Sequence, residues 1–288
     1  MLWVSAAGVS AAHPPEPLPA PAFDSHCHLE MIDRPTPDVV AEAAAAGITR
    51  MITIGTDLES SRWAAARAAE PGVIRAGVAI HPNSTADAAK LGKDEVLAEL
   101  AALAAQPGVV AVGETGLDYY RDHAAPEIQQ EWFRAHIQIA KDTGKALVIH
   151  DREAHDDVLR LLAEEGAPDQ VVFHCFSGGA ELARACADAG YVMSFAGNIT
   201  FPSAQPLRDA AALAPAGLIL VETDAPFLTP VPNRGKPNTP AMSAYTLRFI
   251  AELKDMDTAE LCAAVTATGD RVFGPWLGAP WPGAPWPG

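Results

Sequence analysis

Two histidines stand one residue apart in the stretch FDSHCHLE, at positions 26 and 28. Because side chains alternate between the two faces of a β-strand, His26 and His28 lie on the same side if this stretch is a strand. Two imidazoles on one side could be packed or solvated residues, or they could be the first two ligands of a metal ion. The stretch alone does not decide between these interpretations, so further ligands must be sought elsewhere in the chain.

Four more side chains able to bind metal end later strand-like stretches. A single histidine at a strand end is usually a polar contact at the edge of a sheet, and a single aspartate in TDAP is usually a turn residue. Together with His26 and His28, however, the set contains four histidines and two carboxylates, which suits two divalent ions that share a bridging carboxylate. The four are Glu114 in GETGLDYY, His150 in VIHDREAHDD, His174 in FHCFSGG and Asp224 in VETDAPFL.

The elements that would position these residues alternate along the chain. Stretches rich in β-branched residues, nearly continuous in apolar character, predict strands covered on both faces. These strands are expected at residues 23–29, 50–56, 73–82, 109–118, 146–150, 170–177, 191–195 and 217–226. Amphipathic, alanine-rich segments predict helices at 38–46, 59–69, 94–105, 127–143, 154–165, 180–189, 240–253 and 257–267.

This alternation predicts a single (β/α)8 barrel of the TIM type, in which all the strand ends named above converge on one mouth. A doubly wound open sheet is the alternative fold, but it would need a glycine-rich turn after the first strand, which SHCHLEM lacks. We expect a flexible Ala/Pro-rich tail at 1–22, one barrel domain at 23–275 and a Pro/Gly/Trp-rich tail at 276–288. The start of the chain lacks the basic residues and long apolar stretch of a signal peptide.

Composition limits the partners that the chain can have. A net charge of −16 repels a polyanion at long range, so it argues against a protein that coats DNA regardless of sequence. A phosphate substrate would need local positive charge, including that of bound metal. The four cysteines form no CxxC pair, which predicts free thiols in a reducing compartment and hence a cytoplasmic location. No apolar run is long enough to span a membrane, so we expect no membrane association, and we expect a monomer.

The chain resembles the TatD family of metal-dependent deoxyribonucleases, which belong to the amidohydrolase-like group of TIM barrels. The resemblance rests on DSHCHL, GETGLDYY, HDREAHDD, HCFSGG and ETDAPFLTP, which follow one another in the family's order over about residues 22–275. One departure lies in NRGKPNTP, where Thr239 stands in place of the family's usual glutamate. That departure concerns contacts near Arg234 and Lys236, and it does not touch the predicted ligands.

The resemblance implies a division of the ligands between two divalent ions. One ion would be held by His26, His28 and Asp224, and the second by His150 and His174. Glu114 would bridge them. The reaction implied is hydrolysis of phosphodiester bonds, with 3′–5′ trimming of single-stranded DNA. Nitrogen-rich ligation admits Zn²⁺ or Mn²⁺, whereas the implied DNA chemistry often uses Mg²⁺, so the identity of the metal stays open.

Other residues are candidates for contact with the substrate. Asp224 lies at the edge of the predicted metal site and could orient or deprotonate the attacking water, with Glu114 as the second catalytic carboxylate. Arg side chains can hold two phosphate oxygens at once, although any of them could also be a solvated surface charge. The candidate phosphate contacts are Arg152, Arg234, Lys236, His81 and Ser177, and Tyr119 or Tyr120 could stack on a terminal base.

Two other functions remain open on the same fold. A related barrel could hydrolyse another ester or an amide, for example as a D-aminoacyl-tRNA deacylase. A non-enzymatic scaffold with a vestigial site is the third possibility, and the complete ligand set argues against it. Nothing in the residues separates DNA from an aminoacyl ester as the substrate.

Overall fold

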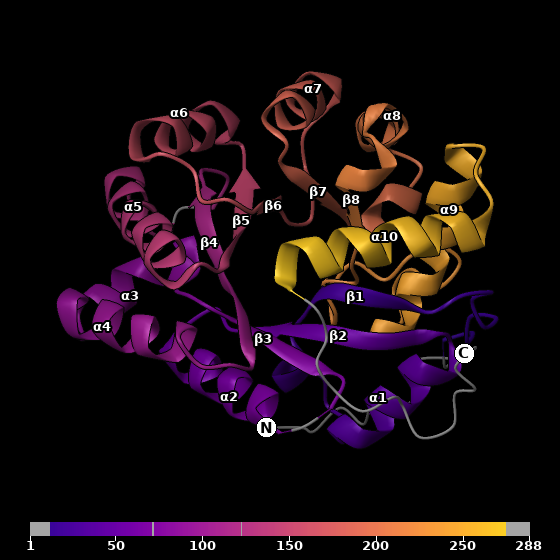
Figure 1. Cartoon of the computed structure of the whole chain (residues 1–288), viewed down its shortest axis with the longest axis horizontal. Coiled ribbons are helices and arrows are strands. Elements are labelled where there is room, and N and C mark those ends of the chain that lie inside the picture. Colours follow the sequence, from indigo (N-terminus) through magenta and orange to yellow (C-terminus); the bar gives the residue numbers. More distant parts are fainter. Residues whose placement is uncertain (1–11, 71, 122, 275–288) are drawn as a thin grey trace, which may run out of the picture.

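The computed structural model describes residues 12–70, 72–121 and 123–274. Eight parallel strands follow one another around a barrel in the order of the sequence, and the helices surround them (Figure 1). The predicted (β/α)8 barrel is therefore confirmed, and the doubly wound alternative is wrong because neighbouring strands are consecutive in the chain. The strands are β1 (Ala22–Cys27), β2 (Ile48–Ile54), β3 (Ile74–Val78), β4 (Val109–Asp118), β5 (Ala146–Arg152), β6 (Val171–Phe173), β7 (Val192–Phe195) and β8 (Ile219–Val221).

The helices agree with the predicted segments, with two additions. The structure adds the short α3 (Thr85–Ala89) and also α8 (Gln205–Leu213), which connects β7 to β8. α3 has five residues and α8 has nine, and helices this short are difficult to recognise from the sequence. The remaining helices are α1 (Thr36–Ala45), α2 (Leu58–Ala69), α4 (Lys93–Ala104), α5 (Pro126–Thr143), α6 (His155–Glu165), α7 (Ala180–Ala189), α9 (Ser243–Leu253) and α10 (Thr258–Phe273).

The barrel closes between the end of β1 and the residues that follow β8. Cys27 and Ala225 form an isolated parallel bridge, and the His28 amide donates to the Ala225 carbonyl over 2.8 Å. In return, the Asp224 amide donates to the His26 carbonyl over 3.0 Å. We call this set of contacts the β1–β8 seam. Because β8 itself ends at Val221, the predicted strand 217–226 is shorter than expected, and its last residues serve the seam instead.

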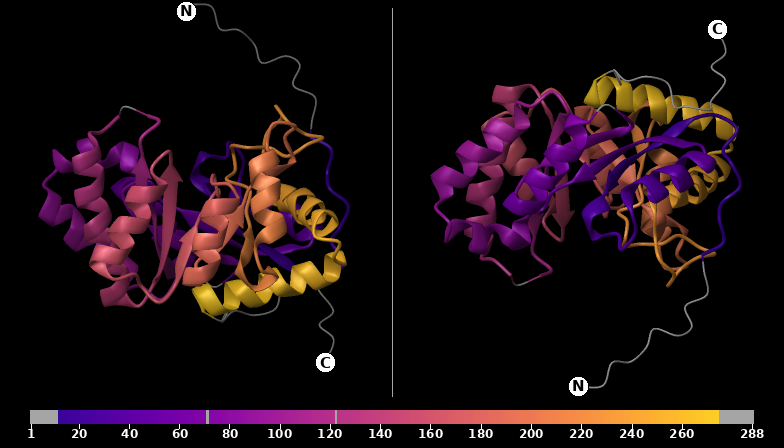
Figure 2. Two further views of the ribbon diagram at one scale, coloured as in Figure 1. Left: turned by 90° about the horizontal axis from the view of Figure 1, so that it is seen from above. Right: turned by 90° about the horizontal axis from the view of Figure 1, so that it is seen from below.

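Helix α10 packs against β1 and β8 from outside the barrel (Figure 2). A Cβ at Gly269 would lie 2.1 Å from the Phe23 ring, so glycine is needed for the helix to approach the sheet this closely. The ring of Phe273, at the end of the helix, meets Phe23 edge to face with 6.4 Å between ring centroids. The helix that follows the last strand thus holds the first strand in place.

Residues 12–21 precede the barrel and lie against it. The backbone of His13 pairs with the buried Asn233 side chain through two hydrogen bonds of 2.8 and 2.9 Å. Arg248 donates to the Pro17 carbonyl over 2.8 Å, and the Leu18 amide donates to the Ala46 carbonyl over 3.0 Å. The rest of the predicted N-terminal tail and all of the predicted C-terminal tail lie outside the described residues, and the division into a domain with two tails stays a prediction.

The sequence predicts free thiols and no membrane span, and the structure describes both features. Cys27, Cys175, Cys186 and Cys262 are all free thiols, and Cys175 alone among them is partly exposed. Within residues 12–274, apart from the two undescribed positions, no helix has both the length and the apolar composition that a membrane span requires.

A buried histidine on α5 fixes the end of β3 next to the barrel mouth. The His136 Nδ1–H group donates to the Trp132 carbonyl over 2.7 Å, and its Nε2 accepts from the Ile80 amide over 3.1 Å. Both partners suit one neutral tautomer, since a proton on Nε2 would meet another N–H group. Burial lowers the pKa of His136 to about 4, although the Trp132 contact opposes part of that shift.

We expect the free energy of unfolding to fall by about 2 kcal/mol between pH 6.5 and pH 5 on account of His136. In this window the unfolded chain binds a proton at His136 and the folded chain does not, so acid favours unfolding. Urea unfolding at both pH values measures the effect. The His136→Gln variant is the control, because it removes the titrating group, and an equally steep loss in that variant would contradict the assignment.

Candidate metal centre

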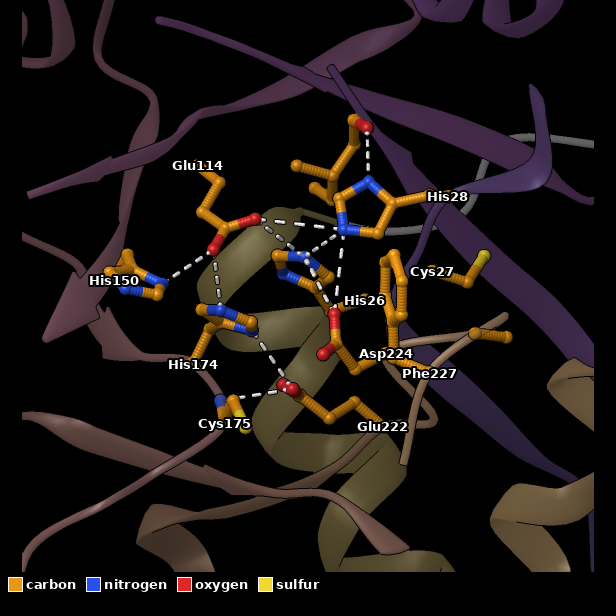
Figure 3. A network of polar contacts seen from close by, with 12 residues as sticks. His26, Cys27, His28, Glu114, His150, His174, Cys175, Glu222, Asp224 and Phe227 are labelled. Atoms are coloured by element: carbon orange, nitrogen blue, oxygen red, sulfur yellow. Dashed lines mark hydrogen bonds and ion pairs between the residues drawn. The ribbon is translucent and has the colours of Figure 1, made fainter. Parts of the chain in front are cut away.

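A cavity of about 650 Å³ opens at the carboxyl ends of the strands. Five of the six predicted ligands line it, and the sixth, His26, lies fully buried beneath it. Figure 3 shows these side chains pointing toward one another from different strands. The cavity is also lined by Arg152, His81 and Ser177, whereas Arg234 is not part of its wall.

The carboxylate of Glu114 lies at the centre of this cluster, at the middle of β4. Its Oε1 is 2.8 Å from His150 Nδ1, 2.8 Å from His174 Nε2 and 3.3 Å from His81 Nε2. Its Oε2 is 3.3 Å from His26 Nε2 and 3.6 Å from His28 Nε2. The two oxygens therefore face two different groups of histidines, which is the arrangement that a bridging carboxylate needs.

The first group comes from β1 and the turn after β8. The His28 Nδ1–H group donates to the Ile54 carbonyl over 2.9 Å, so its Nε2 carries a lone pair toward the cavity. The Nε2 atoms of His26 and His28 are 3.3 Å apart, and Asp224 Oδ1 lies 3.8 and 3.4 Å from them. Strand alternation brings both rings to one side, as the sequence predicts, and the β1–β8 seam brings Asp224 beside them.

The second group contains His150 and His174, and each ring uses its other nitrogen on a further carboxylate. His174 Nδ1 lies 2.9 Å from Glu222 Oε1, and His150 Nε2 lies 3.1 Å from Asp118 Oδ2. Such contacts fix the tautomer and the orientation of histidines that bind metal.

Sequence reasoning missed both of these carboxylates. Glu222 and Asp118 are buried acidic residues inside motifs that were already singled out. Each stands an even number of residues from a predicted ligand, Asp224 for one and Glu114 for the other. That shared parity, at the end of an apolar strand, is the signal that could have found them.

His81 offers the cavity a hydrogen rather than a lone pair. The Asn83 amide donates to His81 Nδ1 over 3.0 Å, so a neutral ring carries its proton on Nε2 and donates to Glu114. Burial lowers the pKa of His81, which keeps the ring neutral despite the charge of Glu114. His81 Nε2 is close enough to Glu114 and His150 to share an ion, but its proton favours the role of a donor.

The electrostatics of the cluster favour positive charge. Burial opposes the charged form of His28, yet contact with Asp224 raises its pKa to about 9. Glu114 and Glu222 likewise raise the pKa of His174 well above its ordinary value against the effect of burial. Burial and the neighbouring His174 lower the pKa of His26, whose ring stacks on that of His174 with 3.8 Å between centroids.

These donors fit a divalent cation. Imidazole nitrogens and carboxylate oxygens converge in three overlapping groups, and a bound cation would supply the positive charge that protons on His28 and His174 otherwise provide. Two buried atoms of the cluster, His26 Nδ1 and Glu222 Oε2, have no hydrogen-bond partner among the described residues. The groups are His26 with His28 and Glu114, His26 with His174 and Glu222, and His81 with Glu114 and His150.

The remaining predicted residues divide between the cavity and its surroundings. The Arg152 guanidinium lies over the Tyr120 ring, 3.9 Å from its centroid, and Arg234 lies over Phe201 at 4.4 Å. The Ser177 hydroxyl donates to the Asp151 carbonyl over 2.7 Å, which anchors the loop after β6. The predicted strand 170–177 ends earlier, at Phe173, since the chain turns at Cys175 with a φ of 40°.

Of the two tyrosines considered for base stacking, one is packed and one is exposed. The Tyr119 hydroxyl donates to Asp157 over 2.7 Å and accepts from Gln130 over the same distance. Tyr120 is 59% exposed. The Thr239 hydroxyl, at the position where the chain departs from the family pattern, donates to Glu42 over 3.2 Å.

Comparison with known proteins agrees with this geometry. Residues 23–274 match the family model described as TatD related DNase. The chain belongs to the TatD family. It is 45% identical to the metal-dependent hydrolase TatD of Mycobacterium tuberculosis, over 87% of this chain and 97% of that protein. It is 38% identical to the metal-dependent hydrolase YcfH of Escherichia coli, over 87% and 94% of the two chains.

A solved structure supports the same fold. The crystal structure of YjjV, a TatD homolog from Escherichia coli, matches with a TM-score of 0.80 and 29% identity over 88% of this chain and 97% of that one. The TatD-family chain described here is thus a metal-dependent hydrolase with a TIM-type barrel, and its histidine and carboxylate cluster lies where barrel enzymes carry their active sites.

We expect Glu222→Gln to weaken metal binding by about 10- to 100-fold, because a neutral amide is a poorer acceptor for His174 and for the Cys175 amide, which also contacts Glu222. Competition with a chromophoric chelator measures the affinity. Glu59→Gln, at an exposed site on α2, is the matched control and should bind metal as the unmodified protein does. Unchanged affinity in Glu222→Gln would show that Glu222 does not support the cluster.

Proposed function

We propose that the protein is a two-metal phosphodiesterase that trims single-stranded DNA from its 3′ end. The observation that carries the proposal is the division of the two Glu114 oxygens between two groups of histidines. One carboxylate that faces two nitrogen-rich groups suits a pair of ions and an in-line displacement at phosphorus. The family description, TatD related DNase, points to the same class of substrate.

Two divalent ions would divide these ligands between them. His26, His28 and Asp224 would hold one, His150 and His174 would hold the other, and the Glu114 carboxylate lies within reach of both groups. The donor set admits Mg²⁺, Mn²⁺ or Zn²⁺. When bound, such ions polarise a phosphodiester oxygen and lower the pKa of a bound water.

The protein side chains orient the reactants and move the proton. Asp224 is the more open of the two predicted ligand carboxylates, with 16% of its side chain exposed against 6% for Glu114, so its carboxylate orients the attacking water and takes its proton. His81 presents an Nε2–H donor on the Glu114 side and stabilises the charge that grows on the phosphate oxygens.

The shape and charge of the protein favour the end of a strand. The cavity is a compact pocket with both acidic and basic side chains in its wall rather than a long basic groove, and the net charge of −16 offers little attraction for a duplex. Arg152 on the cavity wall supplies local positive charge to a phosphate. We place the reaction in the cytoplasm, where the free thiols stay reduced, and we assign it to a monomer.

The decisive experiment compares three substrates with metal-loaded protein. We expect single-stranded DNA labelled at either end to shorten stepwise from its 3′ end, and circular duplex to remain intact. Glu114→Ala is the control, because loss of the shared carboxylate should abolish turnover and reduce bound metal to one ion per chain or fewer. Hydrolysis of D-aminoacyl-tRNA without cleavage of DNA would overturn the proposal and favour the deacylase.

We expect Arg152→Ala to lower kcat/KM on one oligonucleotide by about 2 kcal/mol, or roughly 30-fold, through loss of a charge-assisted phosphate contact. Arg234→Ala should have a smaller effect, because its guanidinium lies over Phe201 and outside the cavity wall. Metal content should stay unchanged in both variants, since arginine does not bind the ion. The reverse order of the two effects would move the phosphate contact to the loop after β8.

A further inference from the structure

One edge of the cavity is apolar although it faces solvent. Phe227 is 51% exposed and Met31 is 42% exposed, and both line the cavity. Met31 ends the short 3-10 helix Leu29–Met31 after β1, and Phe227 follows β8, so the two residues flank the His28 and Asp224 side of the cluster. Figure 3 shows the Phe227 ring beside His28 and Asp224, with His150 across the cluster.

The backbone of Phe227 is held firmly while its ring is left exposed. The Phe227 amide donates to the Asp224 carbonyl over 2.8 Å, and the Phe227 carbonyl accepts from Asn238. Asn238 is itself buried and donates to the Thr223 carbonyl over 3.0 Å. The backbones of Asp224 and Leu228 have φ values of 51° and 57°, which residues other than glycine rarely adopt. The backbone around Phe227 is thus strained and fixed by buried hydrogen bonds, while its ring is exposed. This combination indicates a functional role for the ring.

Phe227 also differs from two other aromatic residues, Tyr120 and Phe201, in the side chains that contact its ring. Arg152 covers a face of Tyr120, and Arg234 covers a face of Phe201. Phe227 makes a T-shaped contact with His28, at 6.3 Å between centroids and 68° between planes. That contact uses at most one face of the phenylalanine ring, and with 51% of the residue exposed the ring keeps a surface that a flat partner can reach.

We propose that Phe227, with Met31 on the same edge, is a stacking platform for the terminal nucleobase of the substrate strand; this inference rests on the proposed nuclease function. A base stacked there would place its adjoining phosphate toward Glu114 and the Arg152 side of the cavity. Stacking on an aromatic ring tolerates any base, because every base has an apolar face, so the platform favours strand ends without reading their sequence.

The test compares oligonucleotides that end in a normal 3′ nucleotide or in an abasic one. For the unmodified protein, kcat/KM should be about 5- to 150-fold higher with the base present, the range that one stacked base supplies. Phe227→Ala should bring this ratio close to one, mainly through KM, whereas Phe227→Trp should keep it and Phe227→Leu should fall between. Leu213→Ala is the matched control, because Leu213 is 48% exposed on α8, and the ratio should not change.

A second measurement does not depend on turnover. An oligonucleotide with 2-aminopurine at its 3′ end and a non-hydrolysable last linkage should lose fluorescence on binding to metal-loaded protein, and Phe227→Ala should abolish that loss while Leu213→Ala keeps it. If the unmodified protein cleaves DNA but the ratio and the quenching are the same in Phe227→Ala, the platform is refuted and the nuclease function stands. If the unmodified protein cleaves neither oligonucleotide, the nuclease function itself fails, and the platform fails with it.

Discussion

The structure depends on one buried charge, the carboxylate of Glu114. Five histidines, from β1 and from the ends of β3, β5 and β6, lie within 3.6 Å of its oxygens. Burial by itself would raise the pKa of Glu114, but His174, His81 and His150 hold it well below its ordinary value. An ionised carboxylate is stable inside a protein only among such partners. The strand ends must therefore converge on Glu114, and a cluster able to hold cations follows from that convergence.

A second set of carboxylates fixes the orientation of the histidine rings that surround Glu114. Glu222 and Asp118 hold the outer nitrogens of His174 and His150, and the Ile54 carbonyl does the same for His28. Each of these rings thereby has one nitrogen committed to the protein and the other directed at the cluster. An acidic molecule with a net charge of −16 can thus present local positive charge to a phosphate once cations are bound.

The sequence predicted the strands, the barrel and the convergence of the six candidate ligands, because apolar runs and strand ends are local patterns. It missed α8, a helix of only nine residues. It also missed Glu222 and Asp118, whose parity indicates the face they share with a ligand but not their partners His174 and His150, which belong to other strands. The pairing of His13 with Asn233, 220 residues later, has no sequence signal at all.

The β1–β8 seam has a consequence for folding as well as for chemistry. Asp224 reaches His28 through the same backbone contacts that close the barrel, namely His28 to Ala225 and Asp224 to His26. A chain whose last strand has not yet docked lacks one wall of the pocket. The complete set of histidines and carboxylates is therefore assembled only when the barrel is closed.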